Sequence, residues 1–210
     1  MKRSAIILAG GSSWRFREYK ATVNLRGKPL ISHVVERVRR LVDEVLIVVS
    51  SEEQGESLRA ILGEEPEIIQ DESEKLEAGG SPLVGALAGF EKARGDYSLL
   101  LPCDTPFISR DVILLLLDLC VNMNAAIPRW PNGYIEPLQA VYKTDASLEA
   151  ARGALKANRL DMRSMIASMG RVRYISTLVI RELDPDLTTF FNVNTRIDLR
   201  RAERILNRRR

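Results

Sequence analysis

Short runs of apolar residues alternate along the chain with longer stretches whose apolar residues recur every three or four positions. The runs "VLIVV" and "YSLLLP" stay largely apolar over successive positions, which is typical of strands covered on both faces. The longer stretches have the period of amphipathic helices. Because strand and helix patterns alternate, the sequence predicts an α/β fold in which a mostly parallel central sheet carries helices on both faces.

The pattern predicts strands over residues 4–9, 44–50, 67–70, 97–101, 124–128, 137–142 and 172–176. It predicts helices over residues 30–41, 54–62, 82–93, 110–122, 144–155, 162–169 and 195–207. No internal repeat, low-complexity segment or linker interrupts this order. We therefore expect a single domain over residues 1–210.

Chemically active residue types follow the first four predicted strands. Gly10 follows the first strand and Ser50 ends the second, while Asp71 follows the third and Cys103 and Asp104 follow the fourth. Ligands of doubly wound sheets bind at the carboxyl ends of the strands. We therefore expect these residues to collect at one edge of the sheet and to form the binding site.

The segment "AIILAGGSSWRFREYK" turns from a strand into a long loop that is rich in glycine and positive charge. Gly10 and Gly11 allow backbone N–H groups to approach an anion, and Arg15 and Lys20 add mobile positive charge. The segment lacks both the GK[ST] ending of a P-loop and the third glycine of a dinucleotide fingerprint. It predicts phosphate binding, with a basic surface loop as the alternative.

The segment "LLLPCDTPFIS" delivers Asp104 to the carboxyl end of a buried strand. A carboxylate beside bound phosphates is a good ligand for Mg²⁺, and Mn²⁺ is an alternative. A turn or a helix cap is the other role open to Asp104. Ser109 lies three residues before Val112 and is the better candidate for that cap, which favours the metal hypothesis.

Two further segments carry candidate ligand groups. In "GGSPLVGALAGF", Gly80 and Pro82 precede or begin a helix whose first N–H groups are free, whereas Gly89 is explained by helix packing. In "FFNVNTRIDL", the amides of Asn192 and Asn194 are spaced to point the same way in an extended segment, where they suit polar ligand groups or a metal. Thr195 is the predicted cap of the last helix, and capping is the alternative role for Asn194.

The composition excludes several other classes of site. The only histidine, His33, falls inside a helix pattern, so neither a Ser-His-Asp triad nor a Cys/His zinc site can be assembled. The two cysteines, Cys103 and Cys120, are expected to be reduced and buried. A reaction without an imidazole base fits attack by a phosphate, which is already ionised near neutral pH.

Charge and hydropathy argue against nucleic acid and membrane partners. The net charge is +3, and the arginines of "RIDLRRAERILNRRR" are not interleaved with aromatic residues for base stacking. The apolar run "VILLLLDLC" is too short to span a bilayer, and the start of the chain lacks a signal-peptide pattern. We expect a cytoplasmic protein with a small anionic ligand.

These segments together resemble the molybdenum cofactor guanylyltransferase family, which lies among the nucleotidyltransferases of Rossmann-like fold. "LAGGSSWRFREYK" is similar to the family's LAGGxSxRMGxxK, "PCDTPFIS" to its CDxPF segment and "FFNVNTRIDL" to its NxNTPxDL. "IIQDES", "GGSPLVGALAG" and "EPLQAVY" also match, so the resemblance covers nearly the whole chain. It implies a three-layer, Rossmann-like fold with a nucleotide-binding half over about 1–108 and an acceptor-binding half over about 109–210.

The resemblance also implies roles for individual residues. It implies that Asp104 binds the metal and that Asn192 and Asn194 face the acceptor. Catalytic residues would be Arg15, Lys20 and Asp104. Nucleotide-binding residues would be Leu8, Ala9, Gly10, Gly11, Lys20, Ser50, Asp71, Gly80, Pro82 and Asp104.

The activity implied by the resemblance is Mg²⁺-dependent transfer of GMP from GTP to the phosphate of molybdopterin, with release of pyrophosphate. Use of CTP, or of phospholactate, cobinamide phosphate or a sugar phosphate as acceptor, stays open, as does transient contact with proteins that handle the cofactor. A non-catalytic nucleotide-binding protein is the alternative of a different class. Arg17 keeps it open, because the family usually has glycine at this place.

Overall fold

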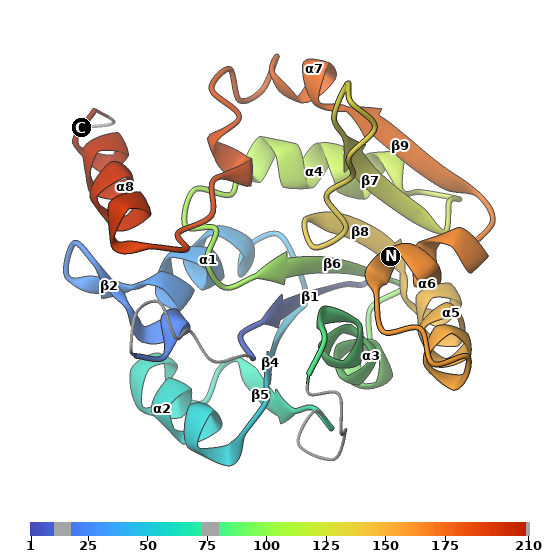
Figure 1. Cartoon of the computed structure of the whole chain (residues 1–210), viewed down its shortest axis with the longest axis horizontal. Coiled ribbons are helices and arrows are strands. Elements are labelled where there is room, and N and C mark those ends of the chain that lie inside the picture. The colour runs from blue at the N-terminus through green and yellow to red at the C-terminus, as the bar shows by residue number, and fades with distance from the viewer. Residues whose placement is uncertain (11–17, 73–79, 209–210) are drawn as a thin grey trace.

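The computed structural model of the chain describes residues 1–10, 18–72 and 80–208. A seven-stranded sheet forms its centre (Figure 1). Its strands are β1 (Arg3–Leu8), β4 (Glu44–Val49), β5 (Glu67–Gln70), β6 (Tyr97–Pro102), β7 (Ala125–Arg129), β8 (Ala140–Lys143) and β9 (Val172–Ser176). They are ordered β5-β4-β1-β6-β8-β7-β9, and β2 (Asn24–Leu25) and β3 (Lys28–Pro29) form a separate two-stranded sheet.

Helices cover both faces of the sheet. The helices are α1 (Leu30–Val38), α2 (Glu52–Leu62), α3 (Pro82–Lys92), α4 (Arg110–Leu119), α5 (Thr144–Lys156), α6 (Met162–Ser168), α7 (Thr177–Ile180) and α8 (Arg196–Arg208). Two short 3-10 helices, η1 (Lys20–Thr22) and η3 (Thr188–Phe190), lie in the connections. Figure 1 shows α4 on one side of the central strands and α3 and α5 on the other.

The alternation of side chains along each strand divides the core into two layers. Ala5 and Ile7 of β1 belong to one buried cluster, together with apolar residues of α1, α2 and α4. Ile6 belongs to the opposite cluster, together with residues of α3, α5 and α6. All three side chains are fully buried, so the continuous apolar strands are covered on both faces. The predicted three-layer α/β fold is confirmed.

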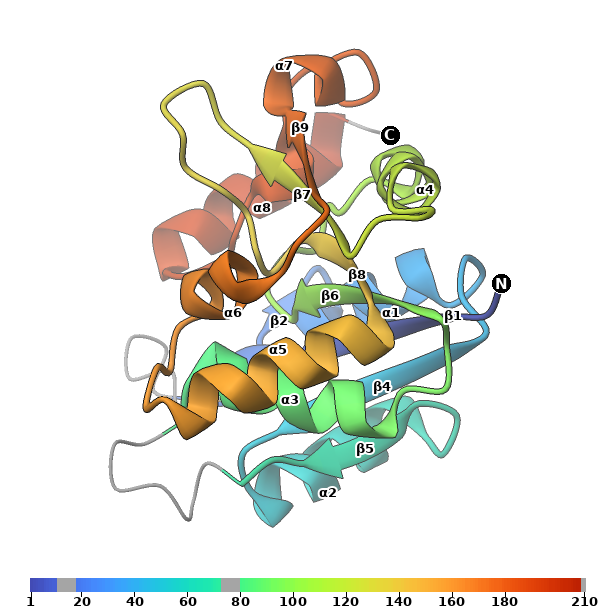
Figure 2. The same cartoon turned by 90° about the vertical axis from the view of Figure 1, so that its right-hand side faces the viewer.

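The direction of the strands changes across the sheet. β1 pairs in parallel with β4 and β6, and β4 pairs in parallel with β5. β8 runs antiparallel to both β6 and β7, whereas β7 and β9 are parallel. The antiparallel β8 therefore begins beside the carboxyl end of β6. Figure 2 shows the segment between β7 and β8 at that end of the sheet.

The observed β8 begins three residues later than the predicted strand over 137–142. Gln139 donates its backbone N–H to the carbonyl of Glu136 at 3.2 Å, which closes a turn before the strand. The carbonyl of Pro137 accepts a hydrogen bond from the Tyr142 hydroxyl at 2.6 Å. These contacts hold 136–139 out of the ladder and leave Leu138 at the edge of the sheet.

Side chains cap the helices where the sequence places hydroxyl residues. Ser109 accepts from the backbone N–H of Val112 at 3.5 Å, as predicted. Thr195 accepts from the N–H of Asp198 at 3.2 Å and donates its hydroxyl to the Asp198 carboxylate at 2.8 Å. The predicted cap at Thr195 is therefore confirmed, and Asp198 completes it.

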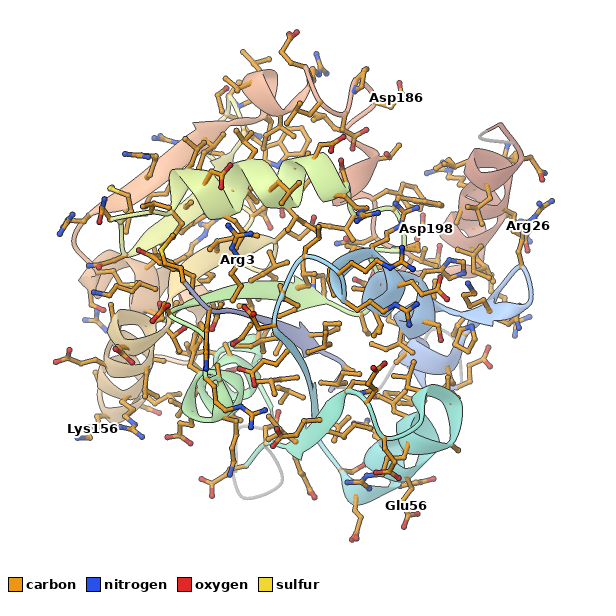
Figure 3. The ribbon with its side chains drawn as sticks, turned by 180° about the vertical axis from the view of Figure 1, so that it is seen from behind. Arg3, Arg26, Glu56, Lys156, Asp186 and Asp198 are labelled. Atoms are coloured by element: carbon orange, nitrogen blue, oxygen red, sulfur yellow. The ribbon has the colours of Figure 1, made fainter. Side chains whose placement is uncertain are left out.

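Charged side chains project from the outside of the molecule. Figure 3 shows Glu56, Lys156 and Asp186 directed away from the layers, and all three are exposed. Both cysteines are buried and free, in agreement with the prediction. Within the described ranges, every helix is too short or too polar to cross a membrane.

Candidate active site

A cavity of about 600 Å³ opens at the carboxyl edge of the parallel strands. Its walls come from the ends of β1, β4 and β6, the segment after β5, the start of α3 and the turn before β8. The lining residues are Leu8, Gly10, Lys20, Val48, Ser50, Asp71, Gly80, Ser81, Pro82, Gly85, Pro102, Cys103, Asp104 and Leu138. The cavity therefore lies where the strand order predicts ligand binding.

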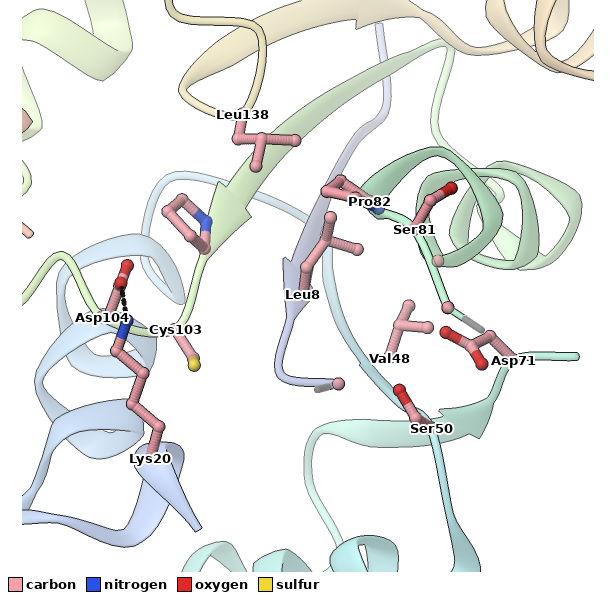
Figure 4. A pocket seen from close by; sticks show the side chains of 14 residues that line it. Leu8, Lys20, Val48, Ser50, Asp71, Ser81, Pro82, Cys103, Asp104 and Leu138 are labelled. Atoms are coloured by element: carbon pink, nitrogen blue, oxygen red, sulfur yellow. Dashed lines mark hydrogen bonds and ion pairs between the residues drawn. The ribbon is translucent and has the colours of Figure 1, made fainter. Parts of the chain in front are cut away.

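Polar groups occupy two separated parts of the cavity wall. Figure 4 shows Lys20 and Asp104 together on one side, and Asp71 and Ser50 together on the other. The apolar side chain of Leu8 lies between these two groups. Such a wall suits an elongated ligand that carries charge near one end, polar atoms near the other and an apolar surface between them.

Gly10 permits a close approach between the ends of β1 and β4. A Cβ atom at this position would lie 2.2 Å from the Ser50 hydroxyl oxygen, far inside a normal contact. The neighbouring Ala9 is buried, and its backbone N–H donates to the carbonyl of Val48 at 2.8 Å. The absence of a side chain at Gly10 therefore keeps backbone available at the floor of the cavity.

Asp104 is held just past the end of β6. Cys103 donates its N–H to the Leu8 carbonyl at 3.0 Å, and Val193 donates its N–H to the Asp104 carbonyl at 2.9 Å. The Asp104 residue is only 7% exposed. One carboxylate oxygen, Oδ2, accepts from Lys20 Nζ, whereas the buried Oδ1 has no hydrogen-bond partner among the described residues.

Lys20 begins η1 and reaches across to two acidic or polar oxygens. Its ammonium forms an ion pair with Asp104 and donates a hydrogen bond to Asn194 Oδ1 at 2.5 Å. The backbone N–H of Asn194 in turn donates to the Asp198 carboxylate at 3.2 Å. The cap of α8 thus fixes the position of Asn194, which accepts the hydrogen bond from Lys20.

Tyr19 and Cys103 support the site without supplying charge. The Tyr19 hydroxyl donates to the Ala9 carbonyl at 2.7 Å, which fixes the segment before Lys20 to the end of β1. Burial, helped by nearby Cys103, raises the pKa of Tyr19, so this hydroxyl stays neutral. Burial and the neighbouring Asp104 raise the pKa of Cys103 to about 12, which keeps it a thiol.

The donor set at Asp104 fits a hard divalent cation. A buried carboxylate oxygen without a partner is unusual in a folded protein and calls for a ligand. Over the described ranges, no three His, Cys, Asp or Glu side chains are grouped to enclose a metal. Mg²⁺ binds through one or two carboxylates and completes its shell with substrate oxygens and water, so the single carboxylate of Asp104 suits it.

The structure brings most of the predicted site residues to this cavity. Leu8, Gly10, Lys20, Ser50, Asp71, Gly80, Pro82 and Asp104 line it. Asn194 contacts Lys20, whereas Asn192 is exposed and makes no hydrogen bond through its side chain to a described residue. Gly11, Arg15 and Arg17 lie outside the described residues.

Cys103, expected at this edge of the sheet, lines the cavity, whereas the predicted site residues did not include Val48, Ser81, Pro102, Gly85 and Leu138. Ser81 and Gly85 flank Pro82 in the segment already singled out, and Ser81 accepts from the Val84 N–H at 3.4 Å as the cap of α3. A Cβ at Gly85 would lie 3.3 Å from Leu8 Cδ2 and 3.4 Å from Asp71 Oδ2, so a larger residue here would press on the Leu8 side chain. Leu138 has no local signal, because its place depends on the antiparallel entry into β8.

Comparison with known proteins gives consistent results. The family described as the MobA-like NTP transferase domain matches residues 5–172. A probable molybdenum cofactor guanylyltransferase of Methanosarcina mazei is 35% identical over 94% of this chain and 88% of its own. A molybdenum cofactor guanylyltransferase of Desulfosudis oleivorans is 33% identical over 95% of this chain and 94% of its own.

A solved structure extends the similarity to the whole fold. The crystal structure of molybdopterin-guanine dinucleotide biosynthesis protein A from Archaeoglobus fulgidus has a TM-score of 0.81 to this chain. The two chains are 28% identical, and the match covers 98% of this chain and 99% of the other.

Proposed function

Since the chain belongs to the MobA-like NTP transferase family and is a nucleotidyltransferase, we propose that it transfers GMP from GTP to the phosphate of molybdopterin. The products are the guanine dinucleotide form of the cofactor and pyrophosphate. The names of the relatives support the guanine nucleotide and the molybdenum cofactor. The reaction needs a site that handles several phosphate charges at once, and the Lys20 ammonium beside Asp104 in the cavity supports this role.

The juxtaposition of Lys20 with the half-satisfied carboxylate of Asp104 carries this proposal. An ammonium and a metal-binding carboxylate on one wall suit a triphosphate and its divalent cation. The opposite wall, with Asp71 and Ser50, suits the hydroxyl and amide groups of a nucleoside. The apolar side chain of Leu8 lies between these two walls, where it suits contact with the apolar face of a sugar or base.

Each residue has a defined task in this proposal. Asp104 would hold Mg²⁺ through its unpartnered oxygen; when bound, Mg²⁺ supplies positive charge to the phosphates. Lys20 neutralises charge that develops at the α-phosphate and on the departing pyrophosphate. An acceptor phosphate oxygen forms the new bond to the α-phosphorus as the bond to the bridging oxygen breaks. The acceptor arrives already ionised, so no side chain is required as its base.

The two substrates of this reaction are assigned to different halves of the chain. We infer that residues 1–108 bind the nucleotide and that 109–210 bind the acceptor within one domain. The nucleotide part contributes the ends of β1, β4 and β6 to the cavity. The acceptor part contributes Leu138 to the cavity and Asn194 to the lysine beside it.

The test is Mg²⁺-dependent release of pyrophosphate by the purified protein with molybdopterin, measured in parallel with GTP, CTP, ATP and UTP. Release with GTP alone is the expected result. Release with CTP alone would support the same reaction class and refute guanine as the base of the nucleotide. No release with any of the four would refute the acceptor and direct the search to other phosphorylated acceptors, with a non-catalytic nucleotide-binding protein as the last alternative.

A further inference from the structure

The ammonium of Lys20 occupies a position that is built to hold a cation. Asp104 Oδ2 and Asn194 Oδ1 both accept from this one nitrogen, and they come from segments that are distant in the sequence. The second oxygen of the same carboxylate, Asp104 Oδ1, is buried and unpartnered. Oxygen atoms are thus gathered around one positive charge, which is the donor type that divalent cations also prefer.

A second lysine–carboxylate pair, outside the cavity, is much more exposed to water than the pair of Lys20 and Asp104. Lys28 donates to both oxygens of Glu36 at 2.8 Å, and these side chains are 41% and 50% exposed. The side chains of Lys20 and Asp104 are 20% and 9% exposed. Water competes with the first pair far more than with the second, so the inner lysine masks its carboxylate more strongly.

We propose that Lys20 is the resident cation of the Asp104 site in the nucleotide-free protein, and that Asn194 is the positioning residue that holds it there. A divalent cation can bind Asp104 fully only after the lysine has moved away. This inference rests on the assignment of Asp104 as a metal ligand in the proposed function. It adds that the chain competes with the metal for that ligand.

The competition has a consequence for the order of binding. Lys20 needs another anionic partner before it can leave Asp104 at low free-energy cost, because an unpaired ammonium in a partly buried position is destabilising. Phosphates of an incoming nucleotide would supply that partner. The nucleotide-free protein should therefore bind divalent cations weakly, and the metal should enter together with the nucleotide.

The experiment is direct titration of the nucleotide-free protein with Mn²⁺, with free Mn²⁺ read by electron paramagnetic resonance. Lys20→Met keeps most of the length of the side chain and removes its charge, so it should tighten Mn²⁺ binding by on the order of tenfold or more. Lys28→Met is the matched control, since it removes a lysine from an ion pair outside the cavity, and it should leave the affinity unchanged. Asp104→Asn in the Lys20→Met background should abolish the gain.

Asn194→Ala tests the positioning role. The loss of one of its two oxygen partners should free Lys20 in part and tighten Mn²⁺ binding by less than Lys20→Met does. Weaker binding in Asn194→Ala would overturn the positioning role. Equal Mn²⁺ affinity in wild type and Lys20→Met would overturn the competition, while leaving the proposed function intact.

Thermal denaturation with and without Mg²⁺ gives a second test, which stays informative if Lys20→Met is less stable than the wild type. Lys20→Met leaves Asp104 as a buried, unpaired carboxylate, so its melting temperature should fall and Mg²⁺ should raise it more than it raises that of the wild type. An identical response of both proteins to Mg²⁺ would overturn the inference. Absence of any metal binding in every protein would overturn it too, together with Asp104 as a ligand; pyrophosphate release would then still decide the proposed function independently.

Discussion

Asp104, at the carboxyl edge of the sheet, differs in its hydrogen bonds from the aspartates at the amino edge. At the amino edge, Asp96 accepts from the N–H of Lys2 at 2.8 Å, and Asp43 accepts from the N–H of Arg3 at 2.7 Å. At the carboxyl edge, Asp104 holds a lysine with one oxygen and leaves the other buried without a partner within the described part of the chain.

Cavity volume does not distinguish these edges. The amino edge has a cavity of about 630 Å³, close to the roughly 600 Å³ at the carboxyl edge. Glu44, which lines the amino-edge cavity, accepts from the Ser4 hydroxyl and the Arg94 N–H, both at 2.6 Å. Satisfied carboxylates stabilise the connections of the fold, whereas an unsatisfied one is available to a ligand. Hydrogen-bond satisfaction of the lining carboxylates, rather than volume, therefore distinguishes the two cavities.

The largest effect is expected for Asp104→Asn. The variant keeps the shape of the side chain and removes the charge that attracts a divalent cation, so turnover should fall by on the order of 10³-fold. Steady-state kinetics with saturating GTP and Mg²⁺ measures this loss. Nucleotide binding in the absence of metal, measured by calorimetry, should be retained in this variant. If turnover were also retained at the wild-type level, the contrast between the two edges would have no functional meaning.

A smaller loss is expected for Lys20→Ala. Its charge acts on the phosphates, so kcat should fall on the order of 10²-fold, while the preference for GTP over other nucleotides should change little. Comparison of kcat and of kcat/KM for GTP and CTP checks this expectation. An unchanged kcat would refute the catalytic role of Lys20.

The smallest effect on activity is expected for Glu44→Gln at the amino edge. Burial raises the pKa of Glu44, but hydrogen bonds from Ser4 and Arg94 outweigh it and hold the pKa below its ordinary value of 4.5. Loss of the carboxylate should lower the free energy of unfolding by about 1 kcal/mol at neutral pH and leave turnover unchanged.

The pH dependence of that stability has a defined sign. The folded protein holds the Glu44 carboxylate ionised more readily than the unfolded chain does, so its contribution is complete above pH 4.5 and fades as pH falls further. Urea unfolding of wild type and Glu44→Gln should therefore differ at neutral pH and converge in acid. A constant difference at all pH values, or a loss of turnover in the variant, would contradict the structural role.

The hydrophobic pattern was sufficient to predict most of the fold. The strands over 67–70 and 172–176 match the observed β5 and β9 at both ends. The ends of other strands differ from the predicted ends by a few residues. Local hydrogen bonds, such as the turn at Glu136 and Gln139, decide where a strand begins to pair. The short elements η3 and α7 were not predicted, since a single turn has too few residues to show a period.

The residue types of the site can be read from the sequence alone: a glycine at the end of one strand, a carboxylate at the end of another, and a lysine after the first loop. Strand polarity placed these groups at one edge, because parallel strands end together. The contacts of Lys20 with Asp104 and Asn194 depend on how distant segments pack together. Lys20 is 84 residues away from Asp104 in the sequence and 174 residues away from Asn194. No local pattern encodes which oxygen a distant ammonium will reach.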